Sequence, residues 1–201
     1  MLTYNSKLIG TPILSVQASG AIASIAAPVV NPDNLKILAF KLQGPIVNAA
    51  NNILDVKSVR EYSPLGLVID DNDELIGPED VVKIKEVLDL NFDLIGLKVE
   101  TKKGSKLGKI IDFSLTSEDF TIQQIIVKRP TIKSFMDPEL TIHRREIVEV
   151  TDYKVIVKDE EKVIKARAAK EDFVPNFVNP FRTHEPGFAP ADTKTPADKD
   201  N

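Results

Sequence analysis

The feature that most constrains the fold is an internal repeat. Leu8-Ile9-Gly10 opens a stretch that continues to about Asp70, and Leu94-Ile95-Gly96 opens a second stretch that continues to about Asp159. Polar and apolar positions recur between the two at an offset of about 85 to 88 residues. Because each copy of so long a repeat must fold as a unit, the sequence predicts two small domains of about 70 residues each.

The composition is that of a globular protein without thiol chemistry. Hydrophobic residues make up 42% and charged residues 28% of the 201 residues, and the net charge of −4 gives no general attraction for nucleic acid. The absence of cysteine excludes disulfides, thiolate metal ligands and a cysteine nucleophile. Only two histidines are present, His143 and His184, so we expect no metal and no cofactor.

No secretory signal or membrane span is expected. Residues 1–5 lack the basic start and apolar run of a signal peptide. The longest stretch of small apolar residues, 18–30, is interrupted by Gly20, Ser24 and Pro28 and is too short to cross a bilayer. We therefore expect a cytoplasmic protein.

The second copy is typical of short β-strands separated by turns. Period-two spacing over residues 107–115 places Ile111, Phe113 and Leu115 on one side of an extended segment. Gly104 precedes this segment at a turn where a positive φ is expected. We expect further strands at 122–127, 147–150 and 155–157.

The first copy follows the same order, with strands expected at 37–42, 59–62 and 67–69. A longer irregular loop interrupts each copy, at 43–52 and at 130–139. About six short strands in about 70 residues, without helices between them, favour a small closed barrel, because closure removes exposed strand edges. The predicted fold is therefore mainly all-β, with two small barrels in tandem.

A short helix is predicted between the copies. Residues 77–80, Gly-Pro-Glu-Asp, place proline in a first turn and acids at the positive end of the helix dipole. Val81, Ile84 and Leu88 then share one face. We expect a linker helix within 76–91 that packs on a barrel, with a partner-docking helix as the alternative.

The C-terminal residues differ from the rest of the chain. We expect a charged helix over 160–172 and then a flexible, mostly disordered tail, because five prolines and scattered charges follow. Four of the nine phenylalanines nevertheless lie in this tail. Phe173, Phe177 and Phe181 form a candidate docking motif, and they either cover the protein's own barrels or bind another molecule.

A specific family pattern occurs in the second copy. Residues 93–99, Asp-Leu-Ile-Gly-Leu-Lys-Val, are followed by a glycine turn and by residues 107–112, Leu-Gly-Lys-Ile-Ile-Asp. An apolar hairpin closes the copy. This pattern resembles the PRC-barrel family, named for the H subunit of the photosynthetic reaction centre. The whole arrangement is similar to bacterial tandem PRC-barrel proteins, although the first copy has Ile22-Ala23 where the family has Leu-Gly.

The resemblance covers roughly residues 6–159 and implies a domain organisation. It places PRC-barrel repeat 1 at 1–75, the linker helix at 76–91, repeat 2 at 92–159 and the tail at 160–201. In this family the glycines lie where a tight turn or a close approach of strands leaves no room for a Cβ atom, so the resemblance gives them a structural role. The resemblance assigns no catalytic residue.

Basic side chains of the second copy form the candidate binding surface. Residues 92–159 carry 12 Lys/Arg against 11 Asp/Glu, whereas residues 1–91 carry 7 against 11. If the strand ends converge, these cations would form one positive rim for RNA phosphate or an acidic protein. No aromatic residues are interleaved to stack bases, so a solvated charged surface is the alternative. The candidates are Lys102, Lys103, Lys106, Lys109, Lys128, Arg129, Arg144 and Arg145.

No catalytic constellation is found in the sequence. The densest acidic run, 70–74, lacks the alternation, the central glycine and the terminal glutamate of a calcium loop. His143 beside two arginines is typical of a solvated surface. We therefore expect no catalytic residue and no enzymatic activity.

Three functions are consistent with these features. The first is a non-enzymatic protein-interaction or adaptor module with a protein partner. The second is an RNA- or ribosome-associated assembly factor, because ribosome maturation factors carry a C-terminal PRC barrel with a similar Asp-Leu-Ile-Gly start, although they pair it with a different N-terminal domain. The third is a peripheral membrane-complex subunit, by analogy with the reaction-centre subunit.

Overall fold

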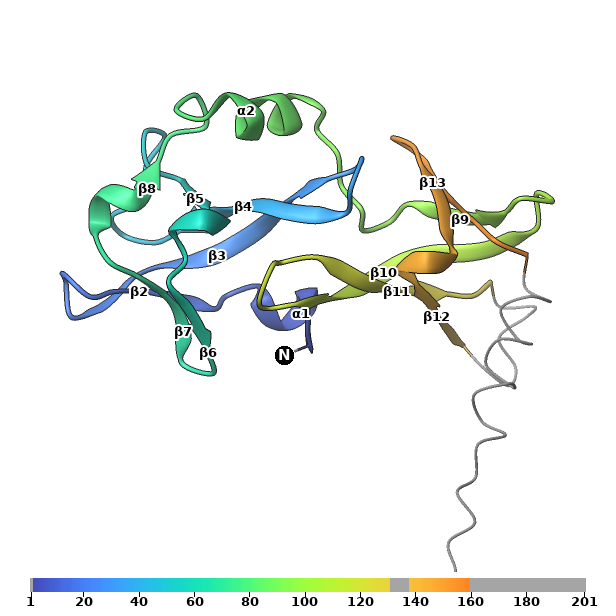
Figure 1. Ribbon diagram of the computed structural model, residues 1–201, viewed down its shortest axis with the longest axis horizontal. Coiled ribbons are helices and arrows are strands. Elements are labelled where there is room, and N and C mark those ends of the chain that lie inside the picture. Colours follow the sequence, from blue (N-terminus) through green and yellow to red (C-terminus); the bar gives the residue numbers. More distant parts are fainter. Residues whose placement is uncertain (1, 131–137, 160–201) are drawn as a thin grey trace, which may run out of the picture.

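The computed structural model describes residues 2–130 and 138–159, which form a mainly β structure with few helices (Figure 1). Two sheets, each with seven strands, account for most of it. The mainly β prediction is therefore confirmed. The predicted helix at 160–172 and the phenylalanine-containing tail lie outside the described residues.

The first sheet is built from the first copy of the repeat. Its strands are β2 (Pro12–Ser15), β3 (Gly20–Asn31), β4 (Lys36–Gln43), β5 (Ile53–Asp55), β6 (Glu61–Ser63), β7 (Gly66–Ile69) and β8 (Leu75–Ile76). They pair in the order β6-β7-β2-β3-β4-β5-β8, and only β2 and β7 are parallel. Two 3-10 turns, η1 (Val56–Ser58) and η2 (Asn72–Glu74), connect these strands.

The second sheet repeats this plan. Six of its seven strands are β9 (Lys98–Thr101), β10 (Lys106–Thr116), β11 (Ile122–Lys128), β12 (Glu139–His143), β13 (Ile147–Val150) and β14 (Lys154–Val157), with the 3-10 turn η4 (Arg144–Glu146) before β13. The order is β12-β11-β10-β9-β14-β13, with β9 and β14 parallel. Gly104, in the turn between β9 and β10, has a φ of 82°, as the sequence predicts.

The same long-range backbone bond occurs in both halves. Gly10 donates its N–H to Ile25 at 2.8 Å, and Gly96 donates to Ile110 at 2.8 Å. The equivalent strands have the same order in the two sheets. In the described residues the first and last strands of each sheet are not paired with each other, so neither sheet closes into a hydrogen-bonded ring.

The two halves pack against each other. The rings of Phe40 on β4 and Phe120 stack edge to face, with centroids 5.5 Å apart and an interplanar angle of 76°. The Ile37 N–H donates to the Phe120 carbonyl at 3.0 Å, and the Ile122 N–H donates to the Leu35 carbonyl at 2.9 Å. Buried side chains of both sheets belong to one continuous apolar cluster, as expected for units too small to bury a full core alone.

The N-terminal residues tie the halves together in a way the sequence did not predict. Strand β1 (Leu2–Tyr4) pairs antiparallel with β10 of the second sheet. The short helix α1 (Asn5–Leu8) follows, and Ser6 donates its hydroxyl to Asp112 at 2.6 Å. The chain then enters the first sheet at β2. The domain boundaries at residues 75, 91 and 159 stay a prediction.

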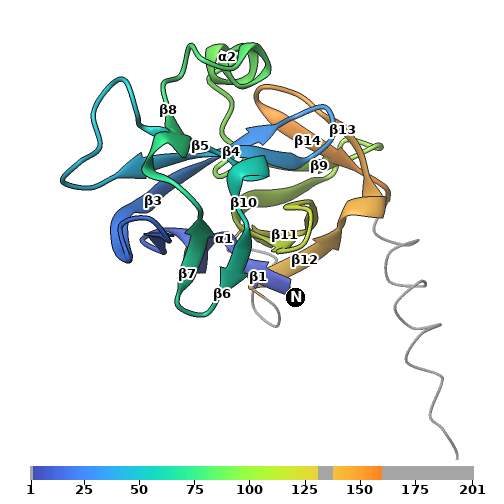
Figure 2. The ribbon, with the colours of Figure 1, turned by 60° about the vertical axis from the view of Figure 1, so that its left-hand side comes forward.

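The predicted helix between the copies is present as α2 (Val82–Asp89). It begins later than the proline suggested, because residues 77–80 form a turn in which the Gly77 N–H donates to the Asp80 carboxylate at 2.6 Å. Figure 2 shows α2 lying over the first sheet. Ile84 is its buried residue and packs with Val29, Ala39 and Ile53.

The predicted core face of β10 is wrong at one position. Phe113 and Leu115 are buried, but Ile111 is 40% exposed and Ile110 is buried instead. The register with β11 shifts between Ile110 and Asp112, so Ile111 is the extra residue of a β-bulge. Because an extra residue interrupts the strict alternation of a strand, it brings Ile110 into the core and turns Ile111 toward solvent.

Candidate anion-binding surface

Four lysines lie in line across four neighbouring strands of the second sheet. Lys109 on β10 is directly opposite Lys128 on β11 and also opposite Lys98 on β9. Lys98 is in turn opposite Lys154 on β14. Because directly opposed residues project from the same face of a sheet, with Cα atoms about 4.5–5.5 Å apart, their side chains form one row. We call these four residues the lysine row.

The lysine row lies on the outer face of the sheet. The residues that follow in sequence, Val99, Ile110 and Val155, are buried, and so is Val127, which precedes Lys128. Lys98, Lys109 and Lys128 are exposed and Lys154 is half-buried. The alternation of a strand therefore separates a buried apolar face from a solvated cationic one.

One end of the lysine row is neutralised, and its other three members are not. Lys154 donates to the Glu100 carboxylate at 3.2 Å, and its ammonium lies 5.8 Å from the centroid of the Tyr153 ring. Across the part of the chain that the structure describes, Lys98, Lys109 and Lys128 have no ion pair or side-chain hydrogen bond. Directly opposed like charges are unfavourable in a sheet, so an anion bound across them would be stabilised.

An apolar groove of about 590 Å³ opens beside the lysine row. Ile95, Ile111 and Pro130 contribute to its apolar lining, and Lys109 and Lys128 contribute cations. Ile111 reaches the groove because of the β-bulge in β10. The surface therefore offers positive charge next to exposed apolar side chains.

The structure divides the predicted basic rim into three groups. Lys109, Lys128 and Arg129 lie together at the groove. Lys102, Lys103 and Lys106 lie at the other end of the β9–β10 hairpin, where Lys103 is 3.9 Å from Asp159 and Lys106 lies opposite Glu100. Arg144 and Arg145 belong to η4.

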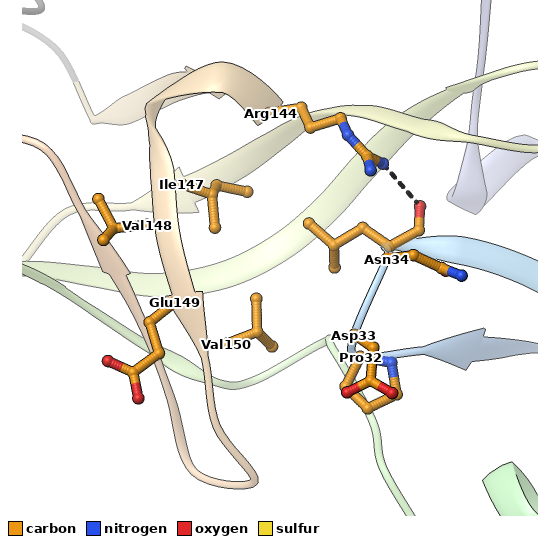
Figure 3. Close-up of a pocket in the computed structure, with 9 residues that line it drawn as sticks. Pro32, Asp33, Asn34, Arg144, Ile147, Val148, Glu149 and Val150 are labelled. Atoms are coloured by element: carbon orange, nitrogen blue, oxygen red, sulfur yellow. Dashed lines mark hydrogen bonds between the residues drawn. The ribbon is translucent and has the colours of Figure 1, made fainter.

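Arg144 has a contact between the two halves. Its guanidinium donates to the Leu35 carbonyl at 3.3 Å and to the Ile122 carbonyl at 3.5 Å. Figure 3 shows the side chain reaching across a cleft of about 370 Å³ toward the turn that carries Pro32 and Asn34. Arg145 is exposed, and its carbonyl accepts a hydrogen bond from the Lys158 ammonium at 2.7 Å. Arg144 thus already has two carbonyl partners within the fold.

Two members of the lysine row, Lys98 and Lys154, were not among the predicted residues. Each immediately precedes a buried valine in a strand, so the period-two pattern alone places both on the outer face. Their alignment could not be found in the same way, because it depends on the pairing of β9 with β14, which are far apart in sequence.

The chemistry of the described residues offers little beyond charge and apolar contact. They hold no group of three or more His, Cys, Asp or Glu side chains arranged for a metal ion. The hydroxyl groups of Thr116 and Thr121 hold the pKa of Asp119 well below its usual range, and this carboxylate lies in the β10–β11 turn. None of the helices in this part of the chain combines the length and hydropathy that a membrane span requires.

Comparison with known proteins gives a partial similarity. No family model matches the chain. A curated protein of Alkaliphilus oremlandii (strain OhILAs), the ribosome maturation factor RimM, is 33% identical over 98 residues, which are 46% of this chain and 54% of that protein. The chain therefore spans about half the length of this curated relative.

Proposed function

We propose that the protein is a non-enzymatic assembly factor that binds a ribosomal particle in the cytoplasm, and that the lysine row contacts RNA phosphates. The similarity to a ribosome maturation factor supports this proposal over the general adaptor hypothesis. We also propose that the two sheets are open PRC-type barrels of two repeats at 1–75 and 92–159, because their strand orders match.

The observation that carries the proposal is the direct opposition of Lys98, Lys109 and Lys128 on three adjacent strands. Three strands span about 10 Å, so the ammonium groups can reach about two or three successive phosphates. Contacts with phosphates position a protein on RNA without reading the RNA sequence. The net charge of the chain is −4, so the residues outside the lysine row are acidic on balance. We therefore expect the attraction for RNA phosphates to be local to the lysine row.

The test is co-sedimentation of the full-length protein with ribosomal subunits and with particles from cells that are impaired in assembly. The charge-reversal variant Lys98→Glu/Lys109→Glu/Lys128→Glu is expected to bind at least about tenfold more weakly, because three phosphate contacts are lost. Binding of the wild type should fall with salt, with a log–log slope of about −2 to −3 for three contacts.

A matched control is available in the first half of the chain. Lys7, Lys41 and Lys57 are also exposed, so their reversal to glutamate changes the net charge by the same amount. This control is expected to retain most of the binding. An equal loss of binding in both variants would show that the net charge of the protein, and not the lysine row, determines binding. Binding to a protein partner but to no ribosomal particle would favour the adaptor hypothesis instead.

A further inference from the structure

The groove beside the lysine row exposes apolar side chains. Its volume is about 590 Å³, and its lining includes Ile95, Ile110, Ile111 and Pro130. Ile111 is 40% exposed in the middle of a long strand. An apolar side chain placed at the surface by a β-bulge, beside a groove of this size, is the kind of feature that marks a binding site.

The groove also carries positive charge. Lys109, Lys128 and Arg129 line it together with the apolar residues. A segment that carries both acidic and bulky apolar side chains would match both properties, because apolar contacts supply affinity and charge complementarity fixes orientation.

This chain carries such a segment itself. Glu171 and Asp172 stand immediately before Phe173, and Phe177 and Phe181 follow without any further charge between them. Pro175 and Pro180 oppose helical continuation, so the segment is suited to an extended conformation. No other stretch of the chain combines an acidic pair with three phenylalanines.

The segment can reach the groove from the point where the described chain ends. Val157 lies opposite Thr101 on the neighbouring strand β9, about 5 Å away, and Ile95 of the groove is six residues before Thr101. Val157 and Ile95 are therefore at most about 27 Å apart. The intervening residues 160–172 span at most about 45 Å when extended, and about 20 Å either as a flexible coil or as the helix expected from the sequence.

We propose that residues 171–181 of this chain occupy the groove, with phenylalanine rings on Ile95 and Ile111 and with Glu171 and Asp172 beside Lys109 and Lys128. The segment then shields part of the lysine row. If the lysine row binds RNA, the segment competes with RNA for this surface. This competition rests on the proposed function, whereas the docking of the segment does not.

The docking is tested by methyl NMR of the full-length protein with labelled isoleucine. The Ile95 and Ile111 methyl signals should show ring-current shifts and contacts to aromatic protons. Both are expected to disappear in Phe173→Ala/Phe177→Ala/Phe181→Ala and to persist in the matched tail variant Phe188→Ala. A synthetic peptide of residues 169–183 added to the triple variant should restore the shifts.

Several results would overturn this proposal. Unchanged isoleucine signals in the triple variant would show that the rings do not contact the groove. Equal changes in the Phe188→Ala control would show an unspecific effect of the tail. Shifts that disappear on dilution would assign the groove to a second copy of the chain. Unchanged ring-current shifts of the Ile95 methyl signals in Ile111→Ser would show that the rings do not pack on Ile111.

The competition with RNA has a separate readout. If the segment covers the groove for about four-fifths of the time, the triple phenylalanine variant should bind ribosomal particles about fivefold more tightly. Loss of the NMR contacts without this gain would overturn the competition and leave the docking intact. If the wild type shows the NMR contacts but neither it nor the triple phenylalanine variant binds ribosomal particles, the proposed function fails and the docking stands.

Discussion

Lys109 on β10 lies directly opposite Lys128 on β11, and within the described part of the chain neither ammonium group has a hydrogen bond or an ion pair. Cross-strand neighbours of like charge are unfavourable in a sheet. The second sheet therefore carries a local electrostatic cost at the edge of its groove. A fold selected for stability alone would avoid this arrangement, whereas a bound phosphate or carboxylate would relieve it.

Removal of the central charge is expected to stabilise the protein. Lys109→Met keeps a long side chain but ends the repulsion with Lys98 and Lys128, so the free energy of unfolding should rise by about 0.2–1 kcal/mol at low salt. The gain should shrink in 1 M salt, where the Debye length is about 3 Å. Urea unfolding at both salt concentrations measures it, with the exposed Lys57→Met as the control. A destabilised variant would contradict the repulsion.

The basic residues at the far end of the β9–β10 hairpin should matter less for binding than the lysine row. Lys103 lies near Asp159 and Lys106 lies opposite Glu100, so nearby acids already lower the local potential. The variant Lys102→Glu/Lys103→Glu/Lys106→Glu is expected to lose about threefold or less in co-sedimentation with ribosomal particles. A loss as large as that of the lysine-row variant would shift the binding site toward the hairpin turn.

Gly108 is expected to tolerate no side chain. Its φ is +147°, and a Cβ atom there would lie 2.0 Å from the Lys128 carbonyl oxygen, so Gly108→Ala must separate β10 from β11. We expect a loss of about 3 kcal/mol or more in the free energy of unfolding. Gly104→Ala is the matched control, because its φ is +82° but a Cβ atom there would have no atom within 4 Å beyond its own chain neighbours. It should lose only about 1–2 kcal/mol. Similar losses in thermal or urea unfolding would contradict the close approach.

The two halves should unfold together. Phe40 is fully buried and meets Phe120 of the other half, so Phe40→Ala is expected to cost about 3–5 kcal/mol. Within each protein, the amide NMR signals of Ile25 and Ile125 should disappear at one common urea concentration, and this concentration should be lower in Phe40→Ala than in the wild type. Leu65→Ala, at a site that is 76% exposed, should change stability by about 0.5 kcal/mol or less. Two separate transitions in the wild type would show that the halves have independent cores.

Acid should remove the contribution of Asp119 to stability. Hydrogen bonds from Thr116 and Thr121 lower the pKa of this carboxyl group in the folded state. A lowered pKa stabilises the fold above the unfolded value of about 3.9, and that stabilisation is lost as the pH falls below it. Because the side chain is 51% exposed, we expect Asp119→Asn to cost less than about 1 kcal/mol at pH 7. The difference from the wild type should shrink below about pH 4 in urea unfolding, and a constant difference would exclude the ionised carboxylate as the cause.

Local patterns in the sequence determined the class of fold. Period-two spacing indicated most of the strands, and the repeat of Leu-Ile-Gly predicted two units, which the structure shows as two sheets with the same strand order. The turn at Gly104 and the helix between the units were also predictable. These features depend on residues that are close together in sequence, where side-chain alternation and turn chemistry act directly.

Only the tertiary structure decided the candidate site. The sequence by itself located excess positive charge in the second half of the chain. It could not show that Lys98 lies opposite Lys109 and Lys154, or that a β-bulge turns Ile111 into a groove. Strand register and bulges are set by long-range hydrogen bonds and by core packing between segments that are far apart in sequence, and a slip of one residue moves every side chain to the opposite face.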